Sequence, residues 1–119
     1  MTDQTRYEFG KNWTRFVKEN ANRERIEIAK KHLLAFIGRE DLRGLDFLDI
    51  GCGSGIHSLG AYEAGAGRLH SFDYDADSVH ATNLIREQAG RPDNWFVERG
   101  DILSNDYVVS VGKWNFVYS

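Results

Sequence analysis

Residues 46–55 decide the fold, and they read Asp46-Phe47-Leu48-Asp49-Ile50-Gly51-Cys52-Gly53-Ser54-Gly55. Phe47, Leu48 and Ile50 form a short apolar run, typical of a parallel strand that is covered on both faces. The glycines that follow make a turn without side chains, so a ligand can come close to the backbone. A helix predicted over residues 56–64 points its unpaired N–H groups and its positive end at the same place. Strand, turn and helix together predict a small-molecule site.

The spacing of the glycines indicates which kind of ligand binds. A dinucleotide-binding turn has the pattern G-x-G-x-x-G, which would need a glycine where this chain has Ile56. Asp49 would also place a negative charge near a pyrophosphate, and like charges repel. An acidic residue there suits a ligand that carries a cation. The pattern acid-x-G-x-G-x-G after a first strand resembles motif I of the class I S-adenosylmethionine-dependent methyltransferases, whose cofactor carries an ammonium and a sulfonium group.

The rest of the chain alternates predicted strands and helices. A helix is expected from Asn20 or Asn22 to Gly38, a second strand over 68–73, a helix from 75 or 76 to 89 and a third strand over 95–98. A weakly patterned stretch over 102–112 precedes a fourth strand over 113–119. This alternation predicts an α/β fold, a partial Rossmann-like parallel sheet in the order 3-2-1-4 with helices on both faces. Ligands of such sheets bind beyond the carboxyl ends of the strands, where the order reverses.

Asp73 ends the predicted second strand, at about the distance after Asp49 where such folds place an acid for the ribose hydroxyls. A carboxylate suits this role because it accepts from both hydroxyls at once. The alternative is a helix N-cap or a surface acid, since Asp75 and Asp77 also lie near a helix start. We expect Asp73 in the site because it alone lies at the strand end.

The resemblance to methyltransferases implies further contacts. Asp49 would face the methionine end of the cofactor, or alternatively bind loop N–H groups. Asp101 would accept from the adenine amino group while the N–H of Ile102 reaches a ring nitrogen, or alternatively Asp101 would cap the segment that follows. The expected cofactor-binding residues are Asp49, Gly51, Cys52, Gly53, Gly55, Asp73, Tyr74, Asp101 and Ile102.

The sequence identifies no catalytic side chain, and it predicts no metal site. Cys52 lies near a helix N-terminus, which lowers a thiol pKa, but no basic partner for a nucleophile is identifiable. The four histidines show no metal-ligand spacing. Methyl transfer from a sulfonium is an in-line displacement that depends mainly on alignment, with a base only if the acceptor must lose a proton. No candidate base stands out.

Composition limits the class of protein. A length of 119 residues fits one small domain, and a net charge of −3 gives no general attraction to nucleic acid. No apolar run approaches the roughly 18 residues of a membrane span. The N-terminus lacks a signal pattern, so we expect a cytoplasmic protein with neither a nucleic acid nor a membrane as partner.

We expect two parts along the chain. Residues 1–43, rich in aromatic side chains near the start, would form an N-terminal helical or lid segment. Residues 44–119 would form the N-terminal half of an S-adenosylmethionine-binding domain that ends after strand four, since the fold of the resembled family continues for three more strands. The unpaired outer edge of strand four then predicts self-association of the isolated chain.

The predicted function is methyl transfer from S-adenosylmethionine to a small-molecule acceptor, with this chain as a cofactor-binding fragment. A non-catalytic module that binds a nucleoside ligand or a partner chain is the alternative. A dinucleotide dehydrogenase fragment is disfavoured by Ile56 and Asp49.

Overall fold

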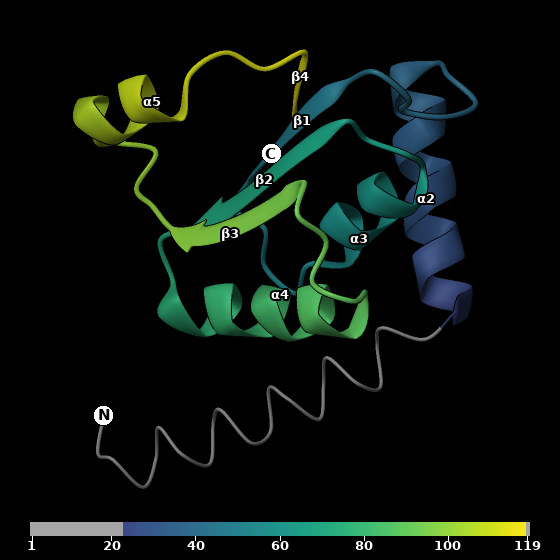
Figure 1. Cartoon of the computed structure of the whole chain (residues 1–119), viewed down its shortest axis with the longest axis horizontal. Helices are drawn as coiled ribbons and strands as arrows, with labels where there is room; N and C mark the ends of the chain where they lie inside the picture. The colour runs from purple at the N-terminus through teal and green to yellow at the C-terminus, as the bar shows by residue number, and fades with distance from the viewer. Residues whose placement is uncertain (1–22, 119) are drawn as a thin grey trace, which may run out of the picture.

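The computed structural model describes residues 23–118, in which helices and strands alternate (Figure 1). They follow in the order α2 (Arg23–Ile37), β1 (Asp46–Ile50), α3 (Ile56–Glu63), β2 (Arg68–Asp73), α4 (Ala76–Gln88), β3 (Trp95–Arg99), α5 (Asn105–Val111) and β4 (Phe116–Tyr118). The strands form one parallel sheet in the order β3-β2-β1-β4, as predicted. Within the described range, no helix has both the length and the apolar character needed to cross a membrane.

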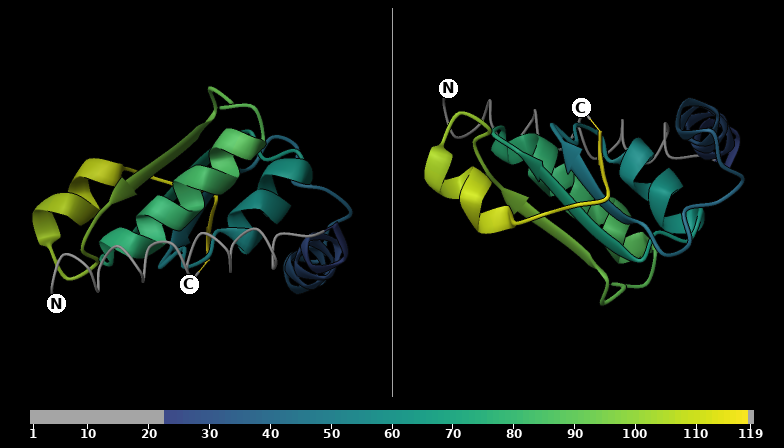
Figure 2. Two further views of the ribbon diagram at one scale, coloured as in Figure 1. Left: turned by 90° about the horizontal axis from the view of Figure 1, so that it is seen from below. Right: turned by 90° about the horizontal axis from the view of Figure 1, so that it is seen from above.

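The helices lie on both faces of the sheet, which confirms the predicted architecture. From β1 through β2 to β3 the chain moves across the sheet in one direction, and it then returns to add β4 beside β1. Right-handed crossovers therefore put α3 and α4 on one face and α5 on the other. Figure 2 shows α4 and α3 in front of the sheet in one view, and α5 in front of it in the opposite view.

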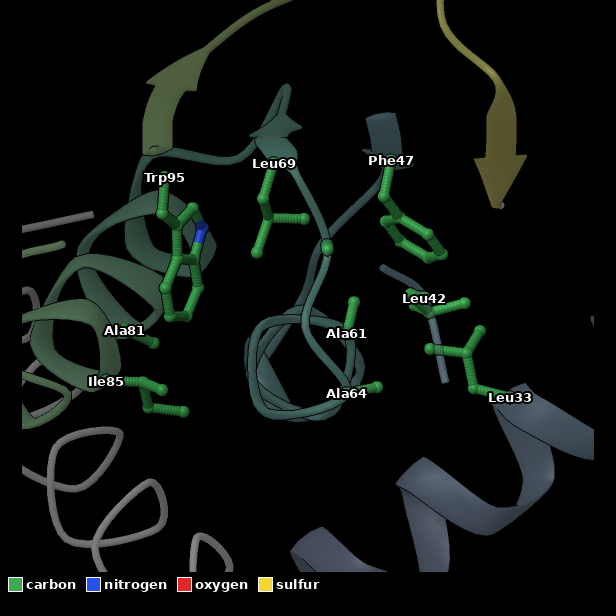
Figure 3. Packing of buried hydrophobic residues seen from close by; sticks show 10 residues of the cluster. Leu33, Leu42, Phe47, Ala61, Ala64, Leu69, Ala81, Ile85 and Trp95 are labelled. Carbon is green, nitrogen blue, oxygen red and sulfur yellow. The ribbon is translucent and has the colours of Figure 1, made fainter. Parts of the chain in front are cut away.

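The hydrophobic core lies between the sheet and the layer of α3 and α4 (Figure 3). Phe47, Leu69 and Trp95 occupy matching positions on the three adjacent strands β1, β2 and β3, and all are fully buried. Their side chains meet Ala61 of α3 and Ile85 of α4, which are fully buried as well. The small residue on α3 lets the helix approach the sheet, while the large rings fill the space above it.

Helix α2 packs against α3 instead of against the sheet. A Cβ added at Gly60 would lie 3.4 Å from the backbone of Lys30, so the two helices approach closely because this residue is a glycine. Arg23 binds both carboxylate oxygens of Glu63 at 2.7 Å. Leu33 is buried in the core cluster, which joins α2 to the rest of the fold. The aromatic residues predicted to form a lid, at positions 7–16, lie outside the described residues.

Residues 102–112, a weakly patterned stretch of the sequence, contain the short helix α5. Ser104 caps it by accepting from the N–H of Tyr107 at 3.3 Å, and Gly112 ends it with a φ of +79°. The ring of Tyr107 lies edge-on to Phe72 of β2, and its hydroxyl donates to Glu98 of β3 at 2.8 Å. None of the helix residues is buried, so the sequence has no apolar periodicity there to reveal a helix.

Strand β4 is shorter than predicted, with three residues in place of the expected 113–119. Trp114 lies before it: its indole N–H donates to Val111 at 2.8 Å, and the guanidinium of Arg68 lies 3.9 Å from its ring centroid. An apolar aromatic residue here therefore binds a cation at the side of the sheet. No strand within residues 23–118 pairs with the outer edge of β4. Self-association through this edge stays a prediction.

Candidate cofactor-binding site

The glycine turn between β1 and α3 leaves backbone open to a ligand. Gly51 and Gly53 have φ values of +70° and +55°, a conformation that side chains rarely adopt. The N–H groups of Gly51 and Cys52 both donate to the carbonyl of Phe72, at 2.8 and 3.0 Å. A Cβ added at Gly51 would meet nothing within 4 Å, and one at Gly53 only a backbone oxygen at 3.9 Å. This side of the turn is open space that a side chain would partly fill.

The last glycine of the turn faces the protein itself. Gly55 has a φ of +85°, and a Cβ on it would lie 3.0 to 3.2 Å from Thr82 of α4. The hydroxyl of Thr82 lies 3.1 Å from the carbonyl of Gly53 and 3.2 Å from the sulfur of Cys52. The three predicted glycines therefore have two roles, because two face the ligand side and one permits α4 to pack against the turn.

Asp73 is joined to the glycine turn by a hydrogen bond. Its Oδ2 accepts from the N–H of Gly53 at 3.1 Å, and its Oδ1 accepts from the N–H of Asp75 at 2.9 Å. The N-cap of α4 is Asp75, which accepts from Asp77 and Ser78, so Asp73 is not the cap. Each carboxylate oxygen has a second lone pair, and Asp73 can therefore accept from two hydroxyls while it holds the turn.

Asp49 is almost fully buried, with 2% of its surface exposed. Ser58 of α3 donates to its Oδ2 at 2.5 Å, whereas no residue between 23 and 118 donates to its Oδ1. Loop N–H groups do not bind this carboxylate, in contrast to the alternative considered from the sequence. Burial raises the pKa of Asp49 to about 6, the bond from Ser58 opposes the shift, and the charge of Asp73 adds to it. A buried acceptor without a donor fits the ammonium group of the expected cofactor.

Buried hydroxyl groups connect Asp49 to the centre of the sheet. The hydroxyls of Ser58 and Ser71 lie 2.6 Å apart, and the indole N–H of Trp95 donates to Ser71 at 2.9 Å. Ser58 and Ser71 are both fully buried. Sequence reasoning missed them, although a serine in an otherwise apolar helix or strand position was the available signal.

The predicted adenine contacts lie at the end of β3. Gly100 donates to the carbonyl of Asp73 at 3.0 Å, which brings Asp101 to the same edge of the sheet. Oδ1 of Asp101 accepts from the N–H of Leu103 at 2.8 Å, so the alternative role in capping the next turn is present. The other oxygen accepts from no residue of the described range. Ile102 is 48% exposed beside it.

Tyr74 follows Asp73 at the rim of this edge and is 65% exposed. Arg99 holds it from the next strand: its Nε donates to the carbonyl of Tyr74 at 2.8 Å, and its guanidinium lies 5.1 Å from the ring centroid. No contact joins Tyr74 to the glycine turn among residues 23–118. The predicted residues therefore form one cluster around Asp49, the turn and Asp73, with Tyr74 and Asp101 at its border.

The environment of Cys52 disfavours the thiolate. The thiol is buried, and burial raises its pKa to about 12, while the hydrogen bond from Thr82 only partly opposes the shift. The group stays a neutral thiol at neutral pH, where a thiolate would be needed for attack.

Two curated relatives overlap this region. The ribosomal protein L11 methyltransferase of Bordetella parapertussis is 39% identical over 83 residues, which cover 60% of this chain and 27% of the relative. The protein of the same name from Xanthomonas campestris pv. campestris is 44% identical over 48 residues, covering 40% of this chain and 16% of the relative. The chain thus spans roughly a quarter or less of the length of these relatives. Both are named for a protein acceptor, so the small-molecule acceptor that we predicted is wrong.

A solved structure shows the same fold. The magnesium protoporphyrin IX methyltransferase from Synechocystis PCC 6803, with bound SAH, superposes with a TM-score of 0.54 and 21% identity, covering 87% of this chain and 40% of that one. At this identity the likeness concerns the arrangement of strands and helices and says nothing of the acceptor. It confirms the Rossmann-like methyltransferase fold.

The sequence model of the ribosomal protein L11 methyltransferase (PrmA) family matches residues 31–110, about two thirds of the chain. The matched range includes the glycine turn, Asp73 and Asp101. The predicted class I methyltransferase resemblance and its cofactor, S-adenosylmethionine, are confirmed by this match. The chain belongs to the ribosomal protein L11 methyltransferase (PrmA) family, within the class I S-adenosylmethionine-dependent methyltransferases.

Proposed function

We propose that this chain is the cofactor-binding part of an S-adenosylmethionine-dependent methyltransferase whose acceptor is a protein. One observation carries the proposal: the backbone is open at Gly51 and Gly53, and the N–H of Gly53 donates to the carboxylate of Asp73. A nucleoside with an amino-acid tail needs both, a backbone that it can approach closely and an acceptor for its ribose hydroxyls. The protein acceptor rests on the names of the two relatives described above.

In this proposal each residue of the site binds a different part of the ligand. Asp73 accepts from the ribose hydroxyls, and Oδ1 of Asp49 accepts from the ammonium of the methionine part. The free oxygen of Asp101 and the N–H of Ile102 bind adenine. When bound, the cofactor supplies an electrophilic methyl group on its sulfonium. The described residues hold it in one orientation, which is the main requirement of an in-line transfer.

The acceptor would reach the site through a groove beside α2. A cavity of about 670 Å³ lies there, lined by His32, Leu33, Phe36, Ile50, Val117 and Tyr118. It includes the ends of β1 and β4, between which the strand order reverses. In keeping with this position, we propose residues 44–119 as the N-terminal half of the cofactor-binding domain and residues 1–43 as a separate helical or lid segment. The predicted cytoplasmic location stays a prediction.

Calorimetric titration with S-adenosylhomocysteine and with NAD tests the cofactor. We expect much tighter binding of S-adenosylhomocysteine, and a loss of about 1.5–3 kcal/mol in Asp73→Ala, the scale of hydrogen bonds to a charged group. Asp77→Ala is the matched control, since Asp77 lies four residues later, on the first turn of α4, and has no contact with the glycine turn. Equal or tighter binding of NAD would contradict the proposal, and an unchanged affinity in Asp73→Ala would remove that residue from the site.

A methyl-transfer assay tests the acceptor. Radiolabelled S-adenosylmethionine is incubated with the methyltransferase of which this chain is the proposed cofactor-binding part, together with either ribosomal protein L11 or a mixture of small-molecule acceptors. We expect label in the protein and none in the small molecules. Tight cofactor binding without transfer to any acceptor would favour the non-catalytic alternative instead.

A further inference from the structure

The hydrogen bonds around Asp49 have a fixed direction. The indole N–H of Trp95 only donates, so the hydroxyl of Ser71 accepts from it at 2.9 Å. An ionised carboxylate only accepts, so the single hydrogen of Ser58 is used on Asp49. Ser71 must then donate to Ser58 across the 2.6 Å between them. Every donor in this chain of bonds therefore acts toward the carboxylate.

We propose that Ser58 is a positioning residue for the cofactor: with Ser71 and Trp95 behind it, it occupies Oδ2 of Asp49 and leaves Oδ1 for the ammonium of the ligand. The inference rests on the proposed function and assigns a role to residues outside the predicted site. Ser58 lies on α3 and does not itself contact the ligand in this arrangement.

The electrostatic surroundings explain why Asp49 needs this donor. The carboxylate is buried, and the charge of Asp73 also opposes its ionisation, so the hydrogen bond from Ser58 is the interaction that favours the charged form. Bonds that point the same way along a chain strengthen one another. The titratable groups at this end of the elements around Asp49 are Cys52 in the turn, His57 on α3, Asp73 on β2 and Tyr118 on β4. Among them, His57 has a pKa below its ordinary value, because it is half-buried and lies near His32.

Two ligands separate positioning from general damage to the fold. S-adenosylhomocysteine carries the ammonium group, whereas 5′-methylthioadenosine lacks the amino-acid part. In calorimetric titrations we expect Ser58→Ala to weaken S-adenosylhomocysteine about tenfold, the scale of one hydrogen bond to a charged group, and to leave 5′-methylthioadenosine unchanged. Ser78→Ala is the matched control, because Ser78 is also buried on a helix and donates to a carboxylate, that of Asp75, at 2.9 Å.

The pH dependence gives a second readout. At pH values under about 6, the affinity of the wild type for S-adenosylhomocysteine should decrease, because Asp49 takes up a proton. Without the donor the pKa of Asp49 rises further, so in Ser58→Ala the fall should begin at higher pH. His57 is present in both proteins, and the difference between the two curves therefore reports Asp49.

Ser58→Cys keeps the size of the side chain and provides a weaker donor, and it replaces the alanine variant if that variant does not fold. We expect it to lose affinity in the same direction and by less. An equal loss for both ligands, or no loss and no shift of the pH curve, would overturn the inference while the proposed function stands. If the wild type binds neither ligand, the proposed function fails, and the inference fails with it.

Discussion

The two faces of the sheet differ most at the edge strands β3 and β4, because on the central strands Leu48 and Phe72 are buried on the α5 face as well. On the α3–α4 face Trp95 is fully buried, whereas the next residue, Phe96, points to the α5 face and is 56% exposed. On β4, Val117 also points to the α5 face and is 50% exposed. Among residues 23–118 only α5 and the segment around Trp114 lie over that second face.

The buried core and the proposed site lie on the same face of the sheet. Asp49, Ser71 and Asp73 alternate with residues of the α5 face and so lie on the α3–α4 side. The buried packing that holds the strands together therefore also fixes the carboxylates of the proposed site. The α5 face supplies Tyr107 and its contacts, but none of the carboxylates of the proposed site.

The largest expected effect on the free energy of unfolding comes from substituting two adjacent residues, one on each face of the sheet. Trp95→Ala should lower the free energy of unfolding by about 3–5 kcal/mol, because it opens a cavity in the closed core. Phe96→Ala should cost less than about 1 kcal/mol, since most of the ring already contacts solvent. Urea titration followed by circular dichroism measures both. Similar losses for the two variants would show that the α5 face is as closely packed as the other.

The next effect separates the glycines of the turn. Gly55→Ala should cost about 2–4 kcal/mol of unfolding free energy, because it combines a left-handed φ with a contact against the backbone of Thr82. Gly53→Ala has the left-handed φ but open space, and should cost about 1–2 kcal/mol.

The two glycine variants should have the opposite order of effects on binding. Gly53→Ala should weaken binding more than Gly55→Ala, because a methyl group at Gly53 lies on the proposed ligand side of the turn. Titration with S-adenosylhomocysteine, on variants shown to be folded, should give the weaker binding for Gly53→Ala. The reverse order would mean that the ligand does not approach Gly53.

Asp49→Asn tests whether the buried charge of Asp49, on the α3–α4 face, lowers the stability of the fold. Burial raises the pKa of the folded state to about 6, above the ordinary value, so folding takes up a proton between those values. The wild type therefore gains stability from this group as the pH falls toward 4 and lacks that gain at pH 7. Asn carries no charge at either pH, so the variant should be more stable than the wild type at pH 7 by about 2–3 kcal/mol and equal to it near pH 4.

Thermal or urea unfolding at both pH values measures the difference, and the same variant should bind S-adenosylhomocysteine more weakly. A constant stability difference across this pH range would show that Asp49 is not the titrating group.

The smallest effect concerns the attachment of α5. Tyr107→Phe removes a hydroxyl that donates to Glu98 at 2.8 Å and should cost about 1 kcal/mol of unfolding free energy. Tyr62→Phe is the control on the other face: its ring stacks on Trp95 at 5.8 Å, and its hydroxyl bonds to no residue of the described range. It should unfold like the wild type. If Tyr107→Phe also has the unfolding free energy of the wild type, the hydroxyl contact does not hold α5 on the sheet.

The sequence predicted the region from β1 to β3 well because each element there has its own local signal. The apolar run before the glycine turn marks β1, and Gly65 and Gly90 follow the helices α3 and α4. The reversal of the strand order followed from general rules of parallel sheets. The later region lacks such signals, since α5 buries none of its residues and contacts the sheet through Tyr107. Ser104 and Gly112, a cap and a stop, were the readable signals of that helix.

The site was predictable where the chemistry of one residue decides its role. Asp73 follows from its place at a strand end, and its additional bond to Gly53 appears only when the turn is folded back against β2. The contact between Ser58 and Ser71 could not be predicted, because it depends on which face of α3 lies over which position of β2. Such long-range geometry is absent from any local pattern.

Cys52 provides a way to measure how often the glycine turn opens. It is the only cysteine of the chain, it lies inside the glycine turn, and it is 7% exposed with a strongly raised pKa. A thiol reagent can therefore react only when the turn opens away from Thr82, so the labelling rate measures the frequency of that local opening. A ligand seated on the turn should slow the labelling in proportion to its occupancy. The labelling rate of Cys52 therefore reports local opening of the proposed cofactor site without any substitution in the chain.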